Sequence, residues 1–228
     1  MKHGYIKKME EVIDSEKPIT HEELATYVEE ILEDPSKISL KVPKEDVSSC
    51  YFPIVQSGGT YDLKLSAQST SERLSHDVIT VSLGARYRSY CSNLARTFLV
   101  DPPKKVSETY DILLEVQMAC LQVMKPGNQL KQVYQAAVHY LQERTGWEYL
   151  AQHLPKNVGF ATGLDFREGV LALSPKNTAS FKAGMAFCLS VGFQDLELSE
   201  EDRAASPEKS PVRSFVLWLV GWLASWFN

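Results

Sequence analysis

The clearest hydrophobic pattern in the chain is a set of extended runs that begins at residue 78. Residues 78–83 form an apolar, β-branched run that predicts a buried strand ending at Gly84. Residues 86–91 alternate charged and aromatic side chains, as a half-buried second strand would. After a polar break at residues 92–93, a third run covers residues 96–100. Such a meander brings polar side chains together at one end of a sheet, and here they are Ser82, Asn93 and Arg96.

Apolar residues recur at helical spacing on both sides of this meander. Before it, helices are predicted over residues 5–13 and 20–32, and the second starts with a Thr-His-Glu-Glu capping box. After it, the same spacing predicts helices over residues 106–121 and 130–141. Shorter apolar runs predict further strands over residues 50–56, 157–160, 169–173 and 186–193.

The order of these elements repeats within the chain. Two helices and then strands occur in the first half, and two helices and then strands occur again in the second. Sequence similarity between the halves is weak, so the repeat concerns the order of the elements. The pattern alone supports an α+β or a mixed α/β protein.

The composition of the chain limits its expected cellular compartment and binding partners. The chain has 228 residues and a formal net charge of −5, which argues against a phosphate-binding protein and suits basic partners. Its four cysteines form no C-x-x-C pair, and the N-terminal residues do not have the pattern of a secretory signal. Reduced thiols in the cytosol or nucleus are therefore expected.

Two polar features that could suggest chemical sites are better explained as structure. Residues 57–60, Ser-Gly-Gly-Thr, lack the rest of a phosphate-binding motif and predict a plain turn. His139 lies on a predicted helix with only Glu143 beside it, which is not enough for a metal site. We therefore expect no cofactor from either feature.

Residues 82–97 resemble the first metal-ligand segment of the methionine aminopeptidase and creatinase superfamily, roughly Asp-x-Gly and then Gly-Tyr-x-x-Asp-x-x-Arg-Thr. Ser82 falls at the position of the first metal-binding aspartate, and Asn93 at that of the second. The scaffold positions are kept by Gly84, Tyr90, Arg96 and Thr97. The run SYCSNLARTFLVDP looks more closely like the peptidase-like domain of the large subunit of the FACT histone chaperone, which keeps the fold and lacks the metal.

The resemblance continues in the second half of the chain. The family pattern Gly-His-x-x-Gly…His-Glu falls on residues 159–168. There Phe160 replaces the metal-binding histidine, and Arg167 replaces a substrate-facing histidine. Residues 184–190 match the strand Gly-Met-x-Phe-x-x-Glu, with Ser190 at the position of the first metal-binding glutamate. The last family glutamate lies on a further strand that the chain is expected to lack.

These replacements remove the chemistry that a metal pair needs. Two divalent ions held ~3.5–4 Å apart require carboxylates and imidazole to offset their charge and to activate water. Hydroxyl, amide and phenyl groups supply no full negative charge, and Arg167 adds a positive one. Other acids lack the spacing of a replacement site, namely Asp165, Glu168 and Asp195. The resemblance thus implies a non-catalytic, metal-free domain.

What the resemblance leaves is a groove shaped for an extended peptide. Two interpretations stay open: the groove binds a peptide or histone tail, or it is unused and binding occurs on an outer surface. The residues expected to line the groove are Ser82, Arg86, Asn93, Phe160, Arg167, Glu168 and Ser190.

The resemblance implies an α+β pita-bread fold with two pseudo-symmetric halves, and a histone-chaperone role on chromosomes in the nucleus. That role is nucleosome reorganisation during transcription, DNA replication and DNA repair. Core histones and the HMG-box small subunit of the FACT complex are the implied partners, without direct nucleic-acid contact. Two alternatives are a diverged metal-dependent aminopeptidase and a membrane-associated truncated paralogue. Relative to the full chaperone subunit, the chain is expected to be truncated at both ends.

The C-terminal residues depart from the family pattern. We expect an aminopeptidase-like domain over residues 1–196, a disordered polar linker over residues 197–213 and an apolar, tryptophan-rich tail over residues 214–228. The tail is shorter than the ~20 residues of a membrane-spanning helix. An interfacial helix, a partner-binding helix and read-through sequence from an altered transcript are all open, and we favour the last.

Overall fold

The computed structural model describes residues 2–15, 18–59, 61–64, 66–76, 78–197 and 214–224, the last range by its backbone. Seven strands in these ranges form one antiparallel sheet, in the order β1-β2-β3-β7-β6-β4-β5. The strands are β1 (Val47–Gln56), β2 (Val78–Tyr87), β3 (Tyr90–Leu99), β4 (Gly159–Thr162), β5 (Glu168–Ala172), β6 (Ala186–Glu197) and β7 (Ser214–Ala224). The helices are α1 (Lys2–Ser15), α2 (His21–Glu33), α3 (Lys104–Val123) and α4 (Lys131–Gln142), with short 3-10 turns η1 (Pro35–Ile38), η2 (Lys44–Asp46) and η3 (Glu148–His153).

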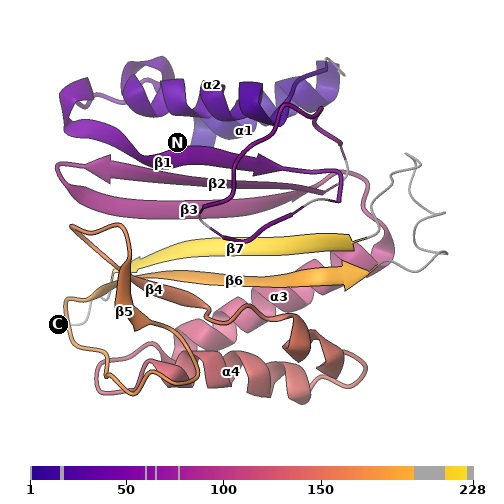
Figure 1. Cartoon of the computed structure of the whole chain (residues 1–228), viewed down its shortest axis with the longest axis vertical. Helices are drawn as coiled ribbons and strands as arrows, with labels where there is room; N and C mark the ends of the chain where they lie inside the picture. The colour runs from indigo at the N-terminus through magenta and orange to yellow at the C-terminus, as the bar shows by residue number, and fades with distance from the viewer. Residues whose placement is uncertain are drawn as a thin grey trace.

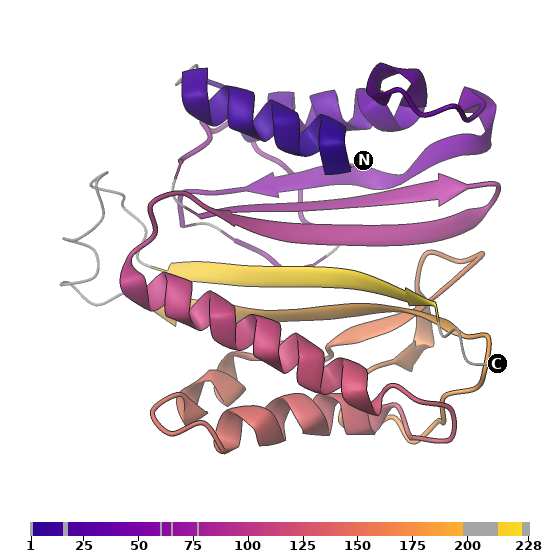
Figure 2. The ribbon, with the colours of Figure 1, turned by 180° about the vertical axis from the view of Figure 1, so that it is seen from behind.

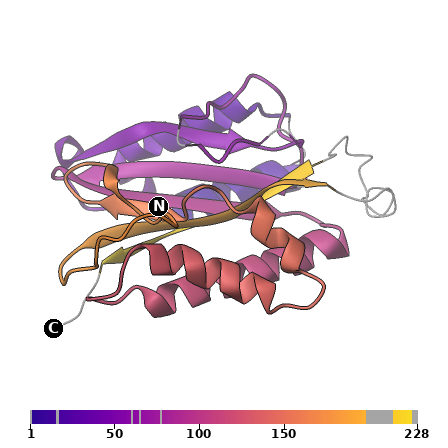
Figure 3. The same ribbon diagram turned by 60° about the horizontal axis from the view of Figure 1, so that its bottom comes forward.

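The helices divide the sheet into two halves, each with its own hydrophobic core. One core joins α1 and α2 to β1 and β2, and the other joins α3 and α4 to β4 and β6 (Figures 1 and 2). Figure 3 shows α3 and α4 side by side beneath the second half. The predicted order of two helices and then strands, repeated once, is confirmed.

All four helices cover the same face of the sheet, because side chains alternate along each strand. Val81 of β2 and Leu189 of β6 are buried in the two helix-facing cores. The residues that follow them point to the opposite face. Ser82 pairs with Ala95, and both Ala95 and Ser190 pair with Val220 of β7. These pairings align Ser82, Ala95 and Ser190 on that opposite face. The face away from the helices is therefore where Ser82, Asn93 and Ser190 gather, whereas Arg96, which follows Ala95 and pairs with Val81, lies on the other face.

The helices predicted from sequence are present, and their local signals are confirmed. The capping box at the start of α2 has both of its bonds: the Glu23 N–H donates to Thr20 Oγ1 at 3.1 Å, and the Thr20 N–H donates to Glu23 Oε2 at 2.8 Å. His139 lies on the surface of α4, and its Nε2 is 3.4 Å from Oε1 of Glu143. All four cysteines are free thiols.

The meander that begins at residue 78 was predicted as three strands and consists of two. β2 continues past Gly84, and β3 runs through the polar residues 92–93. The chain turns at Arg88 and Ser89, whose φ angles of 46° and 72° match the left-handed pair of a tight hairpin. Gly84 does not end the strand. A Cβ there would lie 2.6 Å from Cε1 of Tyr51, so the glycine makes room for an aromatic ring.

The expectation that the chain lacks the closing strand is wrong. Residues 214–224 of the apolar tail form β7, which lies in the middle of the sheet between β3 and β6 (Figure 1). This also excludes a helix over these residues. A continuous apolar run fits a strand as well as it fits a helix, and pairing with two strands decides the outcome. Of the linker predicted over residues 197–213, Glu197 is instead the last residue of β6, and residues 198–213 lie outside the described residues. No helix in the described ranges is both long and apolar enough to cross a membrane.

Candidate functional site

A cleft of about 590 Å³ opens on the face of the sheet away from the helices. Strands β1, β4 and β6 form its base, and the linker after β1 and the loops on either side of β4 form its sides. Figure 1 shows the linker between β1 and β2 running across this face of the sheet. The cleft therefore spans the junction of the two halves of the fold.

The floor beneath the cleft is a chain of hydrogen bonds among neutral side chains. The hydroxyl oxygen of Tyr51 lies 2.5 Å from Oδ1 of Asn93 and 2.6 Å from Oγ of Ser82. Because an amide oxygen can only accept, Tyr51 donates to Asn93 and accepts from Ser82. The Asn93 amide nitrogen then donates to Sγ of Cys188 at 3.6 Å. Each of these four side chains has a partner without any charged group.

Burial keeps the floor uncharged. It raises the pKa of the Tyr51 hydroxyl, and the hydrogen bond from Ser82 opposes this rise only in part. It also raises the pKa of the Cys188 thiol to about 12, because a thiolate would be poorly solvated there. Both groups keep their protons at neutral pH. Neither can serve as a nucleophile or general base in this state.

One wall of the cleft, next to this floor, is formed by aromatic side chains. Phe160 alternates along β4 with Ala161, which packs in the helix-facing core, so the Phe160 ring points into the cleft. The Phe166 ring meets it edge to face at 5.8 Å between centroids and meets the Tyr51 ring at 5.2 Å. The guanidinium carbon of Arg167 lies 5.4 Å from the centre of the Phe160 ring. The wall thus combines apolar surface with a cation held over it.

Among the described residues, the charged side chains that line the cleft are all cations. Lys64 belongs to the linker after β1, Lys156 to the loop before β4 and Arg167 to the loop after it. All three side chains are exposed. No Asp or Glu lines the cleft among the residues that the structure describes. The cleft is therefore a basic site in a chain of net negative charge.

The seven residues predicted to line a groove fall into three groups. Two are buried in the floor, Ser82 and Asn93. Three line the cleft itself, Phe160, Arg167 and Ser190. Two lie outside its lining, Arg86 and Glu168.

Arg86 and Glu168 have separate surroundings. Arg86 is exposed near the end of β2, and its Nε donates to Sγ of Cys91 at 3.4 Å. Glu168 opens β5 at the edge of the sheet, opposite Ala161, and its side chain is exposed. The structure therefore brings five of the predicted residues together and leaves these two apart.

Sequence reasoning missed the residues that hold the floor together. Tyr51 comes from β1, in a stretch that carried only the pattern of a strand, and Cys188 was a thiol within a matched family segment. The signal for Tyr51 was indirect: Gly84 in the middle of a strand indicates that another group approaches the backbone there. Lys156 carried no signal, because the loop before β4 has no motif.

The sequence matches a known protein family over most of its length. The sequence profile of metallopeptidase family M24 matches residues 5–213. The chain belongs to this family.

Several relatives that match most of the chain share one name, FACT complex subunit SPT16. The chain is 41% identical over 204 residues to the FACT complex subunit SPT16 of Oryza sativa, covering 88% of the chain and 19% of that relative. It superposes on the N-terminal domain of SPT16 from chickpea with a TM-score of 0.91 and 40% identity, over 98% of the chain and 51% of that structure. The chain spans about a fifth of the length of the curated relatives it matches.

The same fold occurs in a solved prolidase structure. The prolidase from Thermococcus sibiricus superposes with a TM-score of 0.68 at 20% identity, over 90% of the chain and 48% of that enzyme. At this identity the likeness shows the fold alone. The predicted α+β pita-bread fold is thereby confirmed.

Family M24 is named for metallopeptidases, and the floor of this cleft does not fit a metal ion. Its donors are two hydroxyls, an amide and a protonated thiol, which already bond to one another. Among the described residues, no group of three His, Cys, Asp or Glu side chains comes together as a metal site. Hard divalent ions require oxygen anions or imidazole in such a set. We therefore derive no metal-dependent step for this chain.

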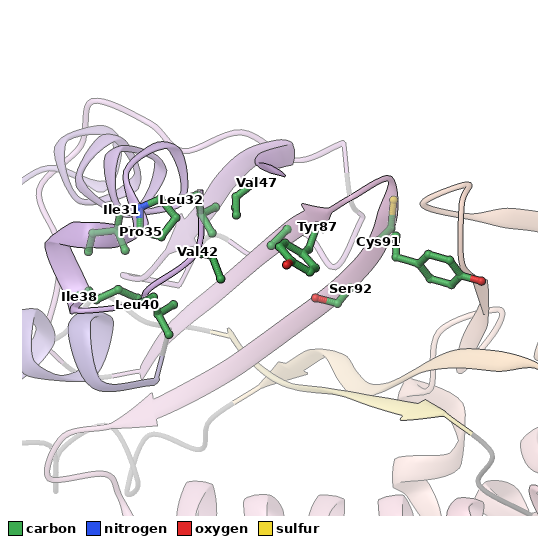
Figure 4. A pocket seen from close by; sticks show the side chains of 12 residues that line it. Ile31, Leu32, Pro35, Ile38, Leu40, Val42, Val47, Tyr87, Cys91 and Ser92 are labelled. Carbon is green, nitrogen blue, oxygen red and sulfur yellow. The ribbon is translucent and has the colours of Figure 1, made fainter. Parts of the chain in front are cut away.

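A second hollow, apolar and separate from the cleft, lies between the end of α2, η1 and the β2–β3 turn (Figure 4). It encloses about 360 Å³ and is lined mainly by aliphatic side chains, among them Ile31, Pro35, Ile38, Val42 and Val47. No carboxylate, amine or imidazole lines it within the described part of the chain. It offers hydrophobic surface and no acid–base chemistry.

Proposed function

We propose that this chain is a non-catalytic, histone-binding module that takes part in nucleosome reorganisation during transcription, replication and repair. Its place of action is chromatin in the nucleus. The partners are core histones and, at the level of the complex, an HMG-box small subunit. Support comes from the relatives named FACT complex subunit SPT16, which are about 40% identical to most of this chain.

The proposal that the chain is non-catalytic rests on the neutral, hydrogen-bonded side chains in the floor of the cleft. The family resemblance puts Ser82, Asn93, Phe160 and Ser190 at metal-ligand positions. Two of them are tied instead to Tyr51, whose hydroxyl bonds to both. A hydrolytic site would have to break these bonds, expose buried groups and gain charges before it could bind an ion. The peptide groove remains, and its proposed role is binding.

Basic histones have a suitable surface on α2, outside the cleft. A hollow of about 360 Å³ on this helix is lined by the side chains of Thr20, Glu22, Glu23, Thr26, Tyr27 and Glu30. Glu23 is engaged in the capping box, and Glu30 pairs with Lys37 at 2.9 Å. The Tyr27 ring already holds one cation, because Lys8 Nζ lies 5.2 Å from its centre. Carboxylates beside an aromatic ring favour a lysine or arginine side chain.

A titration of the purified chain with folded core histones tests the proposal. We would use about 0.15 M salt, where contacts between exposed charges are screened beyond ~8 Å. Saturable binding that persists at this salt is the expected result. The double variant Glu22→Gln, Glu30→Gln should weaken it, and Glu143→Gln on α4 is the matched control, because its carboxylate is exposed and distant in sequence from α2.

Two results would contradict the proposal. One is the absence of saturable binding by a sample that unfolds cooperatively. The other is release of an N-terminal residue from peptides together with stoichiometric cobalt, manganese or zinc in the purified protein, which would favour a diverged aminopeptidase.

A further inference from the structure

The charges of the cleft are the reverse of those on α2. Lys64, Lys156 and Arg167 line the cleft, and no carboxylate does so in the described ranges. The chain as a whole carries a net charge of −5. A local excess of cations in an acidic protein selects a ligand of opposite sign, because the nearest charges dominate when salt screens the distant ones.

Two of the three cations are available to a ligand. Lys64 lies 3.4 Å from the carboxylate of Asp62, so its charge is partly offset. Neither Lys156 nor Arg167 forms an ion pair with a carboxylate of a described residue. Arg167 is also held in place, since its guanidinium lies over the Phe160 ring at 5.4 Å. A guanidinium stacked on a ring keeps its N–H donors directed outward for a carboxylate.

The same cleft has a surface for an apolar side chain. The rings of Tyr51, Phe160 and Phe166 form a connected edge-to-face cluster on one wall. An aromatic or aliphatic group of a ligand would bury area against this wall while its charges reach the rim. A small inorganic anion would leave the wall unused.

The backbone of β6 offers contacts to an extended chain. The Ser190 N–H donates to the Val158 carbonyl at 2.8 Å, so it points away from β7 and toward β4. Backbone groups alternate in an antiparallel strand, and those of Gly192 therefore point the same way, at the base of the cleft. Because the Ser190 N–H is already bonded, the main-chain groups that a peptide lying along β6 could use for strand addition are those of Gly192.

We propose that the cleft binds an extended peptide segment in which carboxylate side chains flank an aromatic or aliphatic residue. This rests on the proposed function insofar as the cleft binds rather than hydrolyses. Lys156 and Arg167 take the carboxylates, and the ring cluster takes the apolar residue. A lysine-rich histone tail is not the occupant, because it would bring further cations against these two. Histones bind at α2, and the cleft takes a different, acidic partner.

Fluorescence anisotropy on the full chain tests this assignment. The probe is a labelled peptide in which glutamates flank one phenylalanine, compared with its glutamine and lysine counterparts. We expect saturable binding of the glutamate peptide and binding at least about fivefold weaker for the other two. The double variant Lys156→Gln, Arg167→Gln should lower affinity for the glutamate peptide by about fivefold. Lys176→Gln, an exposed lysine outside the cleft lining, is the control and should change nothing.

The outcomes separate this proposal from the proposed function. Equal affinity for the three peptides, or an equal loss in the Lys176→Gln control, overturns the acidic-peptide assignment. Displacement of the peptide by single-stranded oligothymidylate of matched charge also overturns it, because the site would then bind polyanions in general. If histones fail to bind while the glutamate peptide binds through Lys156 and Arg167, the proposed function fails and the cleft assignment stands. Cooperative thermal unfolding of each variant confirms that it is folded.

Discussion

The hydroxyl of Tyr51 lies 2.5 Å from the amide oxygen of Asn93, although the two residues belong to strands separated by β2. The strand register places Tyr51, Gly84 and Asn93 in one row across the sheet. With no side chain at Gly84, the tyrosine ring can cross the middle strand and reach the third. One glycine thus makes possible the contact that fills the floor of the cleft.

Removing the Tyr51 hydroxyl should destabilise the fold without changing its shape. Tyr51→Phe keeps the ring that packs on Phe166 and leaves the buried Asn93 oxygen without its donor. An unsatisfied buried polar group costs ~1–3 kcal/mol, and we expect a loss of about this size in the free energy of unfolding. Urea denaturation measures it. Tyr90→Phe is the control, because Tyr90 is 61% exposed, and its effect should be close to zero.

Adding a methyl group at Gly84 should break the same contact from the other side. The Cβ of Gly84→Ala would lie 2.6 Å from Cε1 of Tyr51 and 3.0 Å from Cβ of Cys50, so the ring must move. We expect a loss of ~1–3 kcal/mol, typical of overpacking. Gly163→Ala meets no atom within 4 Å and should be close to neutral.

A double-mutant cycle then decides whether the two changes act on one contact. In a Tyr51→Phe background, Gly84→Ala should cost less than it does alone, because the hydrogen bond is already absent. Strictly additive losses would show that Gly84 matters for another reason.

Restoring one family ligand should not restore hydrolysis. Phe160→His supplies an imidazole where the resemblance expects one, but the neighbouring donors stay neutral, and Cys188 keeps its proton with a pKa near 12. One imidazole cannot hold a co-catalytic metal pair. We expect no release of N-terminal residues from peptides in the presence of manganese or cobalt, and no bound metal by elemental analysis. Detectable turnover by this variant would show that the floor can rearrange into an active site.

The parts of the fold that could be predicted are those fixed by neighbours in sequence. The capping box of α2 is an example, since Thr20 and Glu23 lie three residues apart and form both expected bonds. The spacing of apolar residues in α3 and α4 is another, because a helix contacts the core at every turn.

The features that could not be predicted depend on contacts between residues far apart in the sequence. Gly84 ends no strand, because its role is set by Tyr51, which lies 33 residues earlier and meets it only across the sheet. The cleft cations come from three separate segments, so no local pattern unites Lys64, Lys156 and Arg167. The family resemblance located Ser82, Asn93 and Phe160. It could not show which side chain bonds to Ser82 and Asn93 in place of a metal ion.

Mild acid should weaken the attachment of α2 to the loops beside it. His21 is buried at the start of this helix, with Nε2 2.7 Å from Ser57 Oγ and Nδ1 3.0 Å from Thr70 Oγ1. Burial lowers the pKa of His21 below 6.5, although the nearby Glu72 opposes this. The unfolded chain therefore takes up a proton that the folded chain does not, and stability present above pH 6.5 is lost as the pH falls toward the folded pKa.

The measurement compares urea unfolding at about pH 7.5 and about pH 5.5, on either side of the ordinary histidine pKa. His21→Gln should reduce the drop in stability between the two values. His139→Gln, whose ring is exposed on α4, is the matched control and should leave the drop unchanged. An identical drop in the native chain and in His21→Gln would assign the acid sensitivity to other groups.

The strand β7 should be required for a monomeric fold, because it pairs on both sides. Val220 lies opposite Ala95 on β3 and opposite Ser190 on β6, so it joins the two halves of the sheet. Deleting residues 214–228 would expose the edges of both neighbouring strands, and exposed edges promote association. Size-exclusion chromatography should show oligomers or aggregates of the shortened chain. Val220→Pro removes one N–H from this central strand and should act in the same direction, whereas Val170→Pro in the edge strand β5 should be tolerated better. A shortened chain that stays monomeric and unfolds cooperatively would mean that β3 and β6 can close the sheet without β7.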